Sequence, residues 1–225
     1  MKDIYRIAID GPSGAGKSTI AKEVARRLGI DYIDTGAMYR AIGLSCIRNG
    51  IDINDEANVV KCAETSEVSI TYINDEQAVI LNGENVNGFI RTQEIGNAAS
   101  VVSTYKRVRE ILVALQKNLA KTADVVMDGR DIASCVLPDA KVKIYLDASV
   151  EVRAKRRYKD FVEKGREVDL KTIEDEVRER DYRDMHRENS PLIRVPEATY
   201  VDTSDMTIEE VIDTIVKEAK EKFNV

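Results

Sequence analysis

Apolar residues in the first fifty positions alternate between the spacing of a strand and the spacing of a helix. From Lys17 to Leu28 they recur on one helical face, and Gly29 ends the pattern. The elements predicted here are a strand over 4–10, a helix over 17–28, an extended stretch over 31–34, and a helix that begins at Asp34 or Thr35 and ends near Asn49.

The stretch from about 66 to 90 has a different pattern, because apolar and polar residues alternate one by one. The alternation runs from Val68 to Tyr72 and again from Val79 to Leu81, with turn signals at 74–75 and 82–83. Asn-Gly at 82–83 is the strongest short-range signal for a hairpin. A small antiparallel meander is therefore predicted as an insert in an α/β chain.

The rest of the chain returns to alternating strand and helix patterns. Predicted strands cover 123–128, 141–146 and 198–201, and predicted helical regions cover 91–122, about 149–162 and about 172–187. Thr207 and Glu210 form a capping box that opens a last helix. Strands that alternate with helices predict a parallel sheet covered on both faces.

One motif carries most of the chemistry. The segment from Gly11 to Ser18, GPSGAGKS, fits the pattern G-x-x-x-x-G-K-[ST]. Glycines let backbone N–H groups curl around phosphate oxygens, and the helix that follows presents its positive N-terminus to the same phosphates. Lys17 is expected to reach the β- and γ-phosphates and Ser18 to bind Mg²⁺. The alternative, an ordinary glycine-rich turn, is disfavoured because the motif has a strand before it and an amphipathic helix after it.

Asp128 ends the apolar strand that precedes Gly129. An acid at this place commonly lies near the magnesium of a P-loop protein, directly or through water. The alternative is an aspartate that caps a turn at the end of a strand.

Arginines lie in four places besides the motif. Arg40 lies in the second predicted helix and Arg130 follows a strand end; the others are spaced three or four residues apart on two helices, as Arg153, Arg156, Arg157 and as Arg180, Arg187 with Asp184. Transfer between two phosphates needs such cations, and the guanidinium fork binds phosphate bidentately. The alternative is a solvated surface with ion pairs Glu176–Arg180 and Glu179–Arg183.

Composition narrows the class of protein. A net charge of −6 over 225 residues disfavours a general binder of nucleic acid or of anionic membranes. No apolar run approaches the length of a membrane span, and the first residues lack the pattern of a signal peptide. The three cysteines, Cys46, Cys62 and Cys135, lack metal-site spacing and indicate reduced thiols in a cytoplasmic protein. The single histidine, His186, is expected at the surface.

The sequence resembles the bacterial cytidylate kinases from near residue 4 to about 220. The segments that carry the resemblance are GPSGAGKST, DTGAMYR (34–40), IRTQEIGNAAS (90–100), RVRE (107–110), MDGRDI (127–132), KIYLDAS (143–149) and RERDYRDMHR (178–187). Thr35 stands where many relatives have serine, and Asn85 replaces a more usual aspartate.

The resemblance implies the fold of a P-loop nucleoside monophosphate kinase. Such a protein has a five-stranded parallel sheet flanked by helices, a small antiparallel meander in the NMP-binding lobe and a short LID. For this chain it implies a single domain, 1–225, with a CORE of 1–34, 100–150 and 190–225, an NMP-binding lobe of about 35–99 and a LID of about 153–170.

The activity implied is direct in-line transfer of a phosphoryl group from ATP to CMP or dCMP with Mg²⁺, in a cytoplasmic protein that is a monomer by default. Neither nucleic acid nor membrane is expected as a partner. Closure of the LID and the lobe would exclude water from the reaction.

The resemblance also assigns roles to individual residues. Lys17, Arg130, Arg153 and Arg157 would be catalytic, and Ser18 and Asp128 would hold the metal. ATP would be bound by Gly11, Pro12, Ser13, Gly14, Ala15, Gly16, Lys17, Ser18 and Thr19. The acceptor would be bound by Thr35, Arg40, Ser100, Arg109, Arg130, Asp131, Arg180, Asp184 and Arg187.

The base assignment has a physical reason of its own. Cytosine presents an N4 amino donor that a carboxylate such as Asp131 can accept, whereas uracil presents an O4 acceptor at that place. An ion pair between Asp131 and a neighbouring arginine is the alternative, and the two are compatible. Two rivals stay open: a kinase for UMP, AMP, shikimate or gluconate on the same fold, and a non-catalytic nucleotide-binding switch.

Overall fold

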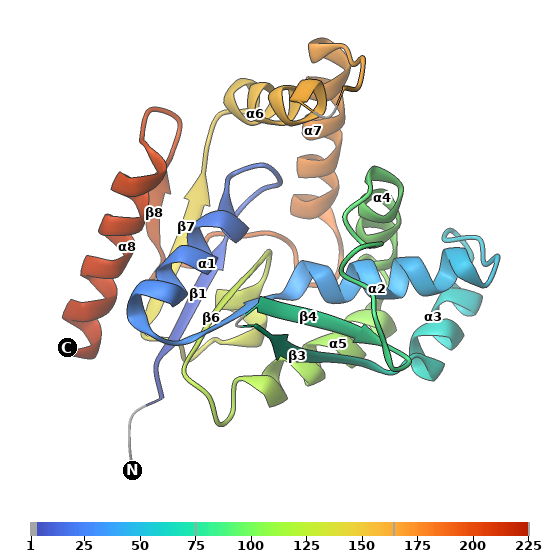
Figure 1. Ribbon diagram of the computed structural model, residues 1–225, viewed down its shortest axis with the longest axis horizontal. Coiled ribbons are helices and arrows are strands. Elements are labelled where there is room, and N and C mark those ends of the chain that lie inside the picture. Colours follow the sequence, from blue (N-terminus) through green and yellow to red (C-terminus); the bar gives the residue numbers. More distant parts are fainter. Residues whose placement is uncertain (1–3, 75, 164, 225) are drawn as a thin grey trace. The chain divides into compact units, whose positions relative to one another are not determined.

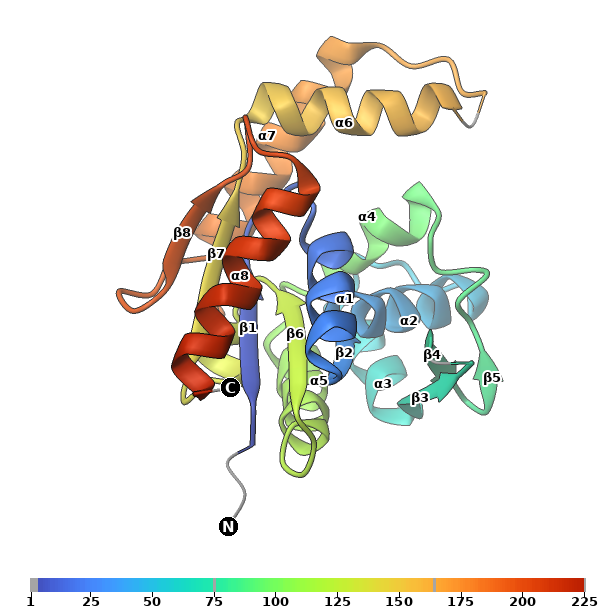
Figure 2. The ribbon, with the colours of Figure 1, turned by 60° about the vertical axis from the view of Figure 1, so that its left-hand side comes forward.

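The computed structural model describes residues 4–74, 76–163 and 165–224. The chain forms two compact units, one made of Met1–Tyr32 with Ala123–Val225 and the other of Ile33–Thr122. Figures 1 and 2 show the elements of both. Each unit is described by itself below.

A five-stranded sheet of order β2-β6-β1-β7-β8 is the centre of the first unit. Its strands are β1 (Arg6–Asp10), β2 (Asp31–Asp34), β6 (Val125–Gly129), β7 (Val142–Asp147) and β8 (Thr199–Asp202). β1 pairs in parallel with both β6 and β7, and β7 pairs in parallel with β8. The predicted five-stranded parallel sheet is confirmed. The carboxyl ends of its strands therefore meet at one edge, where ligands of such sheets bind.

Two helices, α1 (Lys17–Leu28) and α8 (Ile208–Phe223), lie on one side of this sheet (Figure 2). Their apolar faces pack with the strand side chains into one buried cluster that includes Ile9, Val24 and Ile215. Complete burial of such side chains is worth about 1.5–3 kcal/mol each. The predicted capping box opens α8: the Thr207 hydroxyl accepts from the Glu210 N–H, and the Glu210 carboxylate accepts from the Thr207 N–H.

The remaining helices of the first unit are α6 (Val150–Glu163) and α7 (Leu170–His186). They share a small apolar cluster built on Ala154, Ile173 and Val177. Both were predicted within about two residues of their bounds. A five-residue π-helix, η1 (Ile132–Val136), follows β6 and was not predicted.

The second unit contains the predicted meander. β3 (Val68–Ile73), β4 (Glu76–Leu81) and β5 (Glu84–Asn85) form an antiparallel three-stranded sheet, and the Asn-Gly turn at 82–83 joins the last two strands. The other predicted turn, at 74–75, includes Asp75, which lies outside the described residues.

Helices α2 (Thr35–Arg48), α3 (Glu56–Thr65), α4 (Gln93–Val102) and α5 (Lys106–Leu119) complete the second unit. The prediction of one helical region over 91–122 was too coarse, because the chain breaks between α4 and α5. There the Ser103 and Thr104 hydroxyls donate to the carbonyls of Ser100 and Val101, so local side-chain bonds replace the helical ladder. α3 was not predicted.

Candidate active site

The phosphate-binding motif lies where β1 ends. Gly11, the first residue after β1, has φ of +152°, and a Cβ there would lie 1.9 Å from the carbonyl oxygen of Leu146 in β7. The motif thus starts in close contact with the neighbouring strand. Gly16 caps α1 without a side-chain hydrogen bond, so no side chain at that position covers the first backbone N–H groups of the helix.

Lys17 opens α1 and is almost fully buried. Its Nζ donates to the carbonyl oxygen of Pro12 at 2.6 Å, which places the ammonium inside the loop. Burial, followed by the repulsion of Arg130, lowers the pKa of Lys17 to about 7. A phosphate beside it would reverse this shift, because an opposite charge favours the protonated amine.

Ser18, Asp128 and Tyr32 form a hydrogen-bonded group beside the loop. The Ser18 hydroxyl donates to Asp128 Oδ2 at 3.0 Å, and the Tyr32 hydroxyl donates to Asp128 Oδ1 at 2.9 Å. A hydroxyl and a carboxylate this close are the hard oxygen ligands that Mg²⁺ prefers, so the predicted pair fits such an ion. Among the described residues, no group of three or more His, Cys, Asp or Glu could hold a metal ion. Tyr32 was not predicted.

Arg130 follows β6 and pairs with α7. Its Nε donates to Asp184 Oδ2 at 2.8 Å, and both side chains are largely buried. Burial alone would raise the pKa of Asp184, but the charges of Arg130 and Arg180 outweigh it and lower that pKa. Asp184 therefore stays ionised and holds the guanidinium in place.

Asp131 lies next to a second arginine, Arg187, which directly follows α7. Arg187 Nη2 approaches Asp131 Oδ1 at 3.8 Å, and Arg187 Nε donates to the Ser190 carbonyl at 2.6 Å. Asp131 and Arg187 are both at most 9% exposed. Two ion pairs, Arg130–Asp184 and Asp131–Arg187, thus join four of the predicted acceptor residues of the first unit. The second pair is the alternative that the sequence analysis gave for Asp131.

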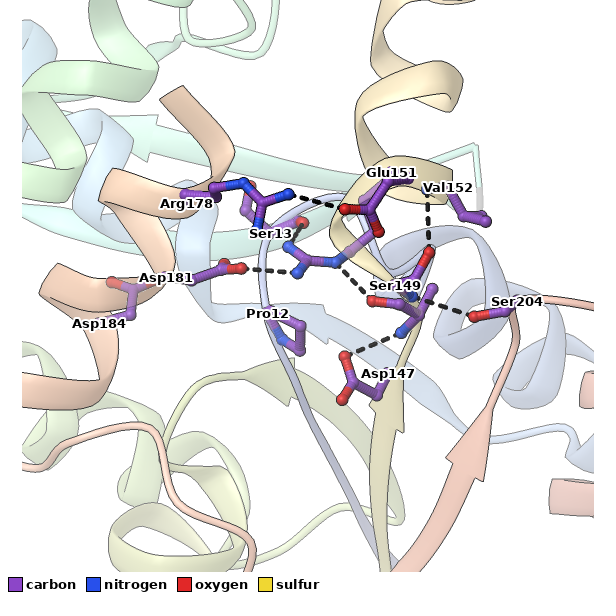
Figure 3. Close-up of polar contacts among 12 residues, drawn as sticks. Pro12, Ser13, Asp147, Ser149, Glu151, Val152, Arg178, Asp181, Asp184 and Ser204 are labelled. Carbon is purple, nitrogen blue, oxygen red and sulfur yellow. Dashed lines mark hydrogen bonds and ion pairs between the residues drawn. The ribbon is translucent and has the colours of Figure 1, made fainter. Parts of the chain in front are cut away.

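Arg153 at the start of α6 has every branch of its guanidinium engaged. Figure 3 shows two of its partners, Ser13 of the loop and Asp181 of α7. Nε donates to the Ala148 carbonyl at 2.8 Å, Nη1 to the Ser13 carbonyl at 3.0 Å and Nη2 to Asp181 Oδ2 at 2.6 Å. The side chain is 4% exposed. In this state Arg153 connects the P-loop with α7. Its predicted contact with the transferred phosphoryl group stays a prediction.

Arg157, one turn further along α6, pairs with Glu176 at 3.1 Å and lies over the ring of Phe161. The pair predicted between Glu179 and Arg183 is present at 2.6 Å. His186 is exposed, as predicted, and stacks on Tyr182.

The predicted residues of the second unit lie on three helices. Thr35 is buried in the first turn of α2, after Asp34, whose carboxylate accepts from the Ala37 N–H. Arg40 donates to the carbonyl of Ile90 at 3.0 Å, in the segment that leads into α4.

Ser100 near the end of α4 is buried, and so is Arg109 in α5. Arg109 Nη1 donates to the Ser103 carbonyl at 3.3 Å, and its guanidinium lies 5.6 Å from the ring of Tyr39 in α2. This contact is of the cation–π type and connects α5 with α2. Cys46 and Cys62 are buried and form no disulfide.

Asp10 is a second residue of the first unit, besides Tyr32, that the sequence analysis missed. Asp10, the last residue of β1, is 2% exposed and accepts from the backbone N–H groups of Ile132 and Ala133. The signal was its place directly before Gly11, at a strand end where an apolar residue would continue the pattern.

Comparison with known proteins identifies the family of this chain. Residues 7–221 match the protein family described as cytidylate kinase. The chain belongs to the cytidylate kinase family. A cytidylate kinase of Lactobacillus gasseri is 50% identical over 212 residues, which cover 94% of this chain and 92% of the relative. One of Lactobacillus johnsonii is 48% identical over 219 residues, 97% of this chain and 95% of the relative.

The fold of this cytidylate kinase family member is shared more widely. A shikimate kinase from Bacteroides thetaiotaomicron superposes with a TM-score of 0.51 at 14% identity, over 99% of this chain and 100% of that one. This likeness concerns the fold alone. Membership of the family makes the protein an enzyme, a kinase and therefore a transferase. No helix in the described part of the chain is long and apolar enough to cross a membrane.

Proposed function

We propose that this enzyme phosphorylates CMP and dCMP with ATP and Mg²⁺, giving CDP or dCDP and ADP. The observation that carries the proposal is the buried charged group of the first unit: the P-loop lysine, the Arg130–Asp184 pair and Asp131 beside Arg187. Two cytidylate kinases that share about half of its residues add support from the relatives' names.

The donor nucleotide would bind at the motif Gly11–Thr19. Backbone N–H groups of the loop and of the α1 N-terminus would donate hydrogen bonds to the phosphate oxygens, and Lys17 would reach the β- and γ-phosphates. Ser18 and Asp128 would hold Mg²⁺, which would neutralise negative charge on the phosphates. The short distance between their oxygens, 3.0 Å, supports this pairing.

The acceptor residues are divided between the two units. In the first unit Arg130 and Arg187 would hold the acceptor phosphate, and Arg180 and Asp184 the sugar. Asp184 is already fixed by Arg130, so its carboxylate is oriented before any ligand arrives. In the second unit Arg40 would hold the phosphate, with Thr35 near the sugar.

Base selection would depend on Asp131, Ser100 and Arg109. The carboxylate of Asp131 would accept from the cytosine N4 amino group, and Arg109 would donate to N3 or O2. Uracil would place an acceptor against the same carboxylate. When an analogue leaves such a group unpaired, its kcat/KM can be several orders of magnitude lower in favourable cases.

The chemical step requires little covalent help from the protein. An oxygen of the CMP phosphate attacks the γ-phosphorus in line with the bond to the β–γ bridging oxygen; that bond breaks, and ADP leaves with its electron pair. Lys17, Arg130 and Arg157 would stabilise the charge on the equatorial oxygens, and positioning would supply much of the acceleration. Arg153 would join them if it leaves its contacts with Ser13 and Asp181. We place the reaction in the cytoplasm, in a monomer.

An acceptor panel tests this proposal. ADP release is followed by a coupled assay with Mg²⁺ and ATP and with CMP, dCMP, UMP, AMP or GMP as acceptor. We expect fast turnover with CMP and dCMP and much slower turnover with UMP. Faster turnover with AMP or GMP than with CMP would contradict the roles given to Asp131 and Arg109. Inert nucleotides combined with tight ATP binding would instead favour another acceptor or a nucleotide-dependent switch.

A further inference from the structure

Asp10 links the end of β1 to the chain that follows β6. Its Oδ1 accepts from the Ile132 N–H at 2.8 Å, and its Oδ2 accepts from the Ala133 N–H at 2.7 Å. These distances are typical of strong hydrogen bonds to an ionised carboxylate. The two oxygens of one side chain thus fix two successive backbone groups that lie more than 120 residues away in the sequence.

Those two N–H groups belong to the first turn of η1, immediately after Arg130 and Asp131. The first N–H groups of a helix have no partner within it, and they need one when they are buried. Asp131, the residue at the N-cap position, makes no side-chain capping bond. Asp10 therefore supplies from another strand the cap that the local sequence does not, and Asp131 keeps its carboxylate for other partners.

This arrangement is costly for folding. Burial raises the pKa of Asp10 to about 6, even though both backbone hydrogen bonds act to lower it. The neighbouring charge of Asp131 adds to the cost, whereas Lys17 reduces it. A buried carboxylate that is held at a net expense in stability occurs most often where the position of a group matters for function.

We propose that Asp10 is a positioning residue of this kinase: by holding the start of η1, it fixes Arg130 and Asp131 in the orientation that selects the acceptor. The inference rests on the proposed function, because it presupposes that Arg130 and Asp131 contact the acceptor nucleotide. Asp10 itself touches neither nucleotide in this account.

The test compares Asp10→Asn with a matched control. Asparagine has the same shape but only one acceptor oxygen, so its NH₂ group would face one of the two N–H donors. Asp124→Asn is the control, since Asp124 Oδ1 accepts from the Tyr5 N–H at 2.7 Å at the opposite ends of the same two strands. Both variants exchange a carboxylate that accepts a backbone N–H for an amide.

The quantity to measure is the ratio of kcat/KM for CMP to that for UMP. Both activities scale with the same concentration of folded enzyme, so the ratio does not depend on how much of a variant is folded. A displacement of about 1 Å can cost up to roughly 10²-fold in rate. We expect Asp10→Asn to lower the ratio by about tenfold and to raise the KM for CMP more than the KM for ATP, whereas Asp124→Asn keeps the wild-type ratio.

Three results would overturn the inference. The first is an unchanged ratio in Asp10→Asn. The second is an equal rise in the KM values for ATP and CMP. The third is loss of all activity together with loss of ATP binding. Either of these two results would mean that Asp10 stabilises the fold as a whole and does not position the acceptor residues specifically. The wild-type enzyme in the same assay tests the proposed function separately: a wild type without preference for CMP refutes that function, whereas a normal wild type with an unchanged variant refutes only the role of Asp10.

Discussion

Gly11→Ala is the substitution whose effect follows most directly from the structure. A Cβ at this position would lie 1.9 Å from the carbonyl oxygen of Leu146 and 3.0 Å from its carbonyl carbon. Contacts below 3.0 Å are essentially never made by real Cβ atoms, so the backbone at position 11 and the backbone of Leu146 have to move apart by about 1 Å. Leu146 is fully buried in β7 and paired with β8, which makes the first residues of the P-loop the part that moves.

A shift of this size lies at the place where the loop would hold the donor phosphates. Misplacement by about 1 Å can cost roughly 10²-fold in rate. We therefore expect kcat/KM for ATP to fall by about 10²-fold or more in Gly11→Ala, measured by coupled ADP release at saturating CMP. The variant should remain folded, because β1 and its neighbours lose no core side chain.

Gly29→Ala is the matched control. Gly29 also has positive φ, +66°, but nothing lies within 4 Å of the position of a Cβ there. Its cost is the strain of a left-handed alanine, about 1–2 kcal/mol of stability, with activity near wild type. Wild-type kcat/KM in Gly11→Ala, or equal losses of activity in both variants, would refute the reasoning from close contact.

Three further predictions follow from the same unit. Arg130→Ala should lower kcat with CMP by about 10²–10³-fold in steady-state assays, because a cation at the transferring phosphate is lost. Its circular dichroism spectrum should stay unchanged. Near-normal turnover would contradict the role of Arg130. Asp181→Ala should lower the free energy of unfolding by about 3–5 kcal/mol in urea titrations, because it leaves the buried Arg153 without its carboxylate partner at 2.6 Å. A loss below about 1 kcal/mol would show that the ion pair contributes little to stability. Asp10 binds its proton more tightly in the folded state, so its contribution to stability is fully present below pH 3.8 and is lost as the pH rises through about 6. The unfolding free energy of wild type relative to Asp10→Asn should therefore fall by about 2.4 kcal/mol between pH 4 and 7. A constant difference would contradict the raised pKa.

The sequence predicted most of the fold because its signals are local. The P-loop, the Asn-Gly turn at 82–83 and the capping box at Thr207 each specify a backbone geometry within a few residues. α3 was missed because its apolar residues are only Ala, Val and Cys, with no large apolar side chain, and only Val59, Cys62 and Ala63 are buried. The break between α4 and α5 depends on hydroxyl-to-carbonyl bonds that compete closely with a continuous helix.

The residues alone indicated the candidate site where the signal is local. Lys17, Ser18 and Asp128 were predicted because motif spacing and strand ends indicate them, and their roles stay predictions. The contacts of Asp10 with η1 and of Arg153 with Asp181 join residues that are 122 and 28 positions apart, respectively, and no local pattern reports such pairs. Glu176 illustrates the same limit: its contact with Arg157 on the neighbouring helix was not predicted.

The central claim is that a phosphoryl group is transferred from ATP to CMP. It is tested most directly with ATP labelled with ³²P in its γ-phosphate, by following where the label goes. The enzyme is incubated with labelled ATP, Mg²⁺ and CMP, and the products are separated by chromatography. The account predicts that the label appears in CDP, in amounts equal to the ADP formed, and that little inorganic phosphate is released. Label found only in inorganic phosphate, or none released from ATP while the nucleotide stays bound, would contradict it.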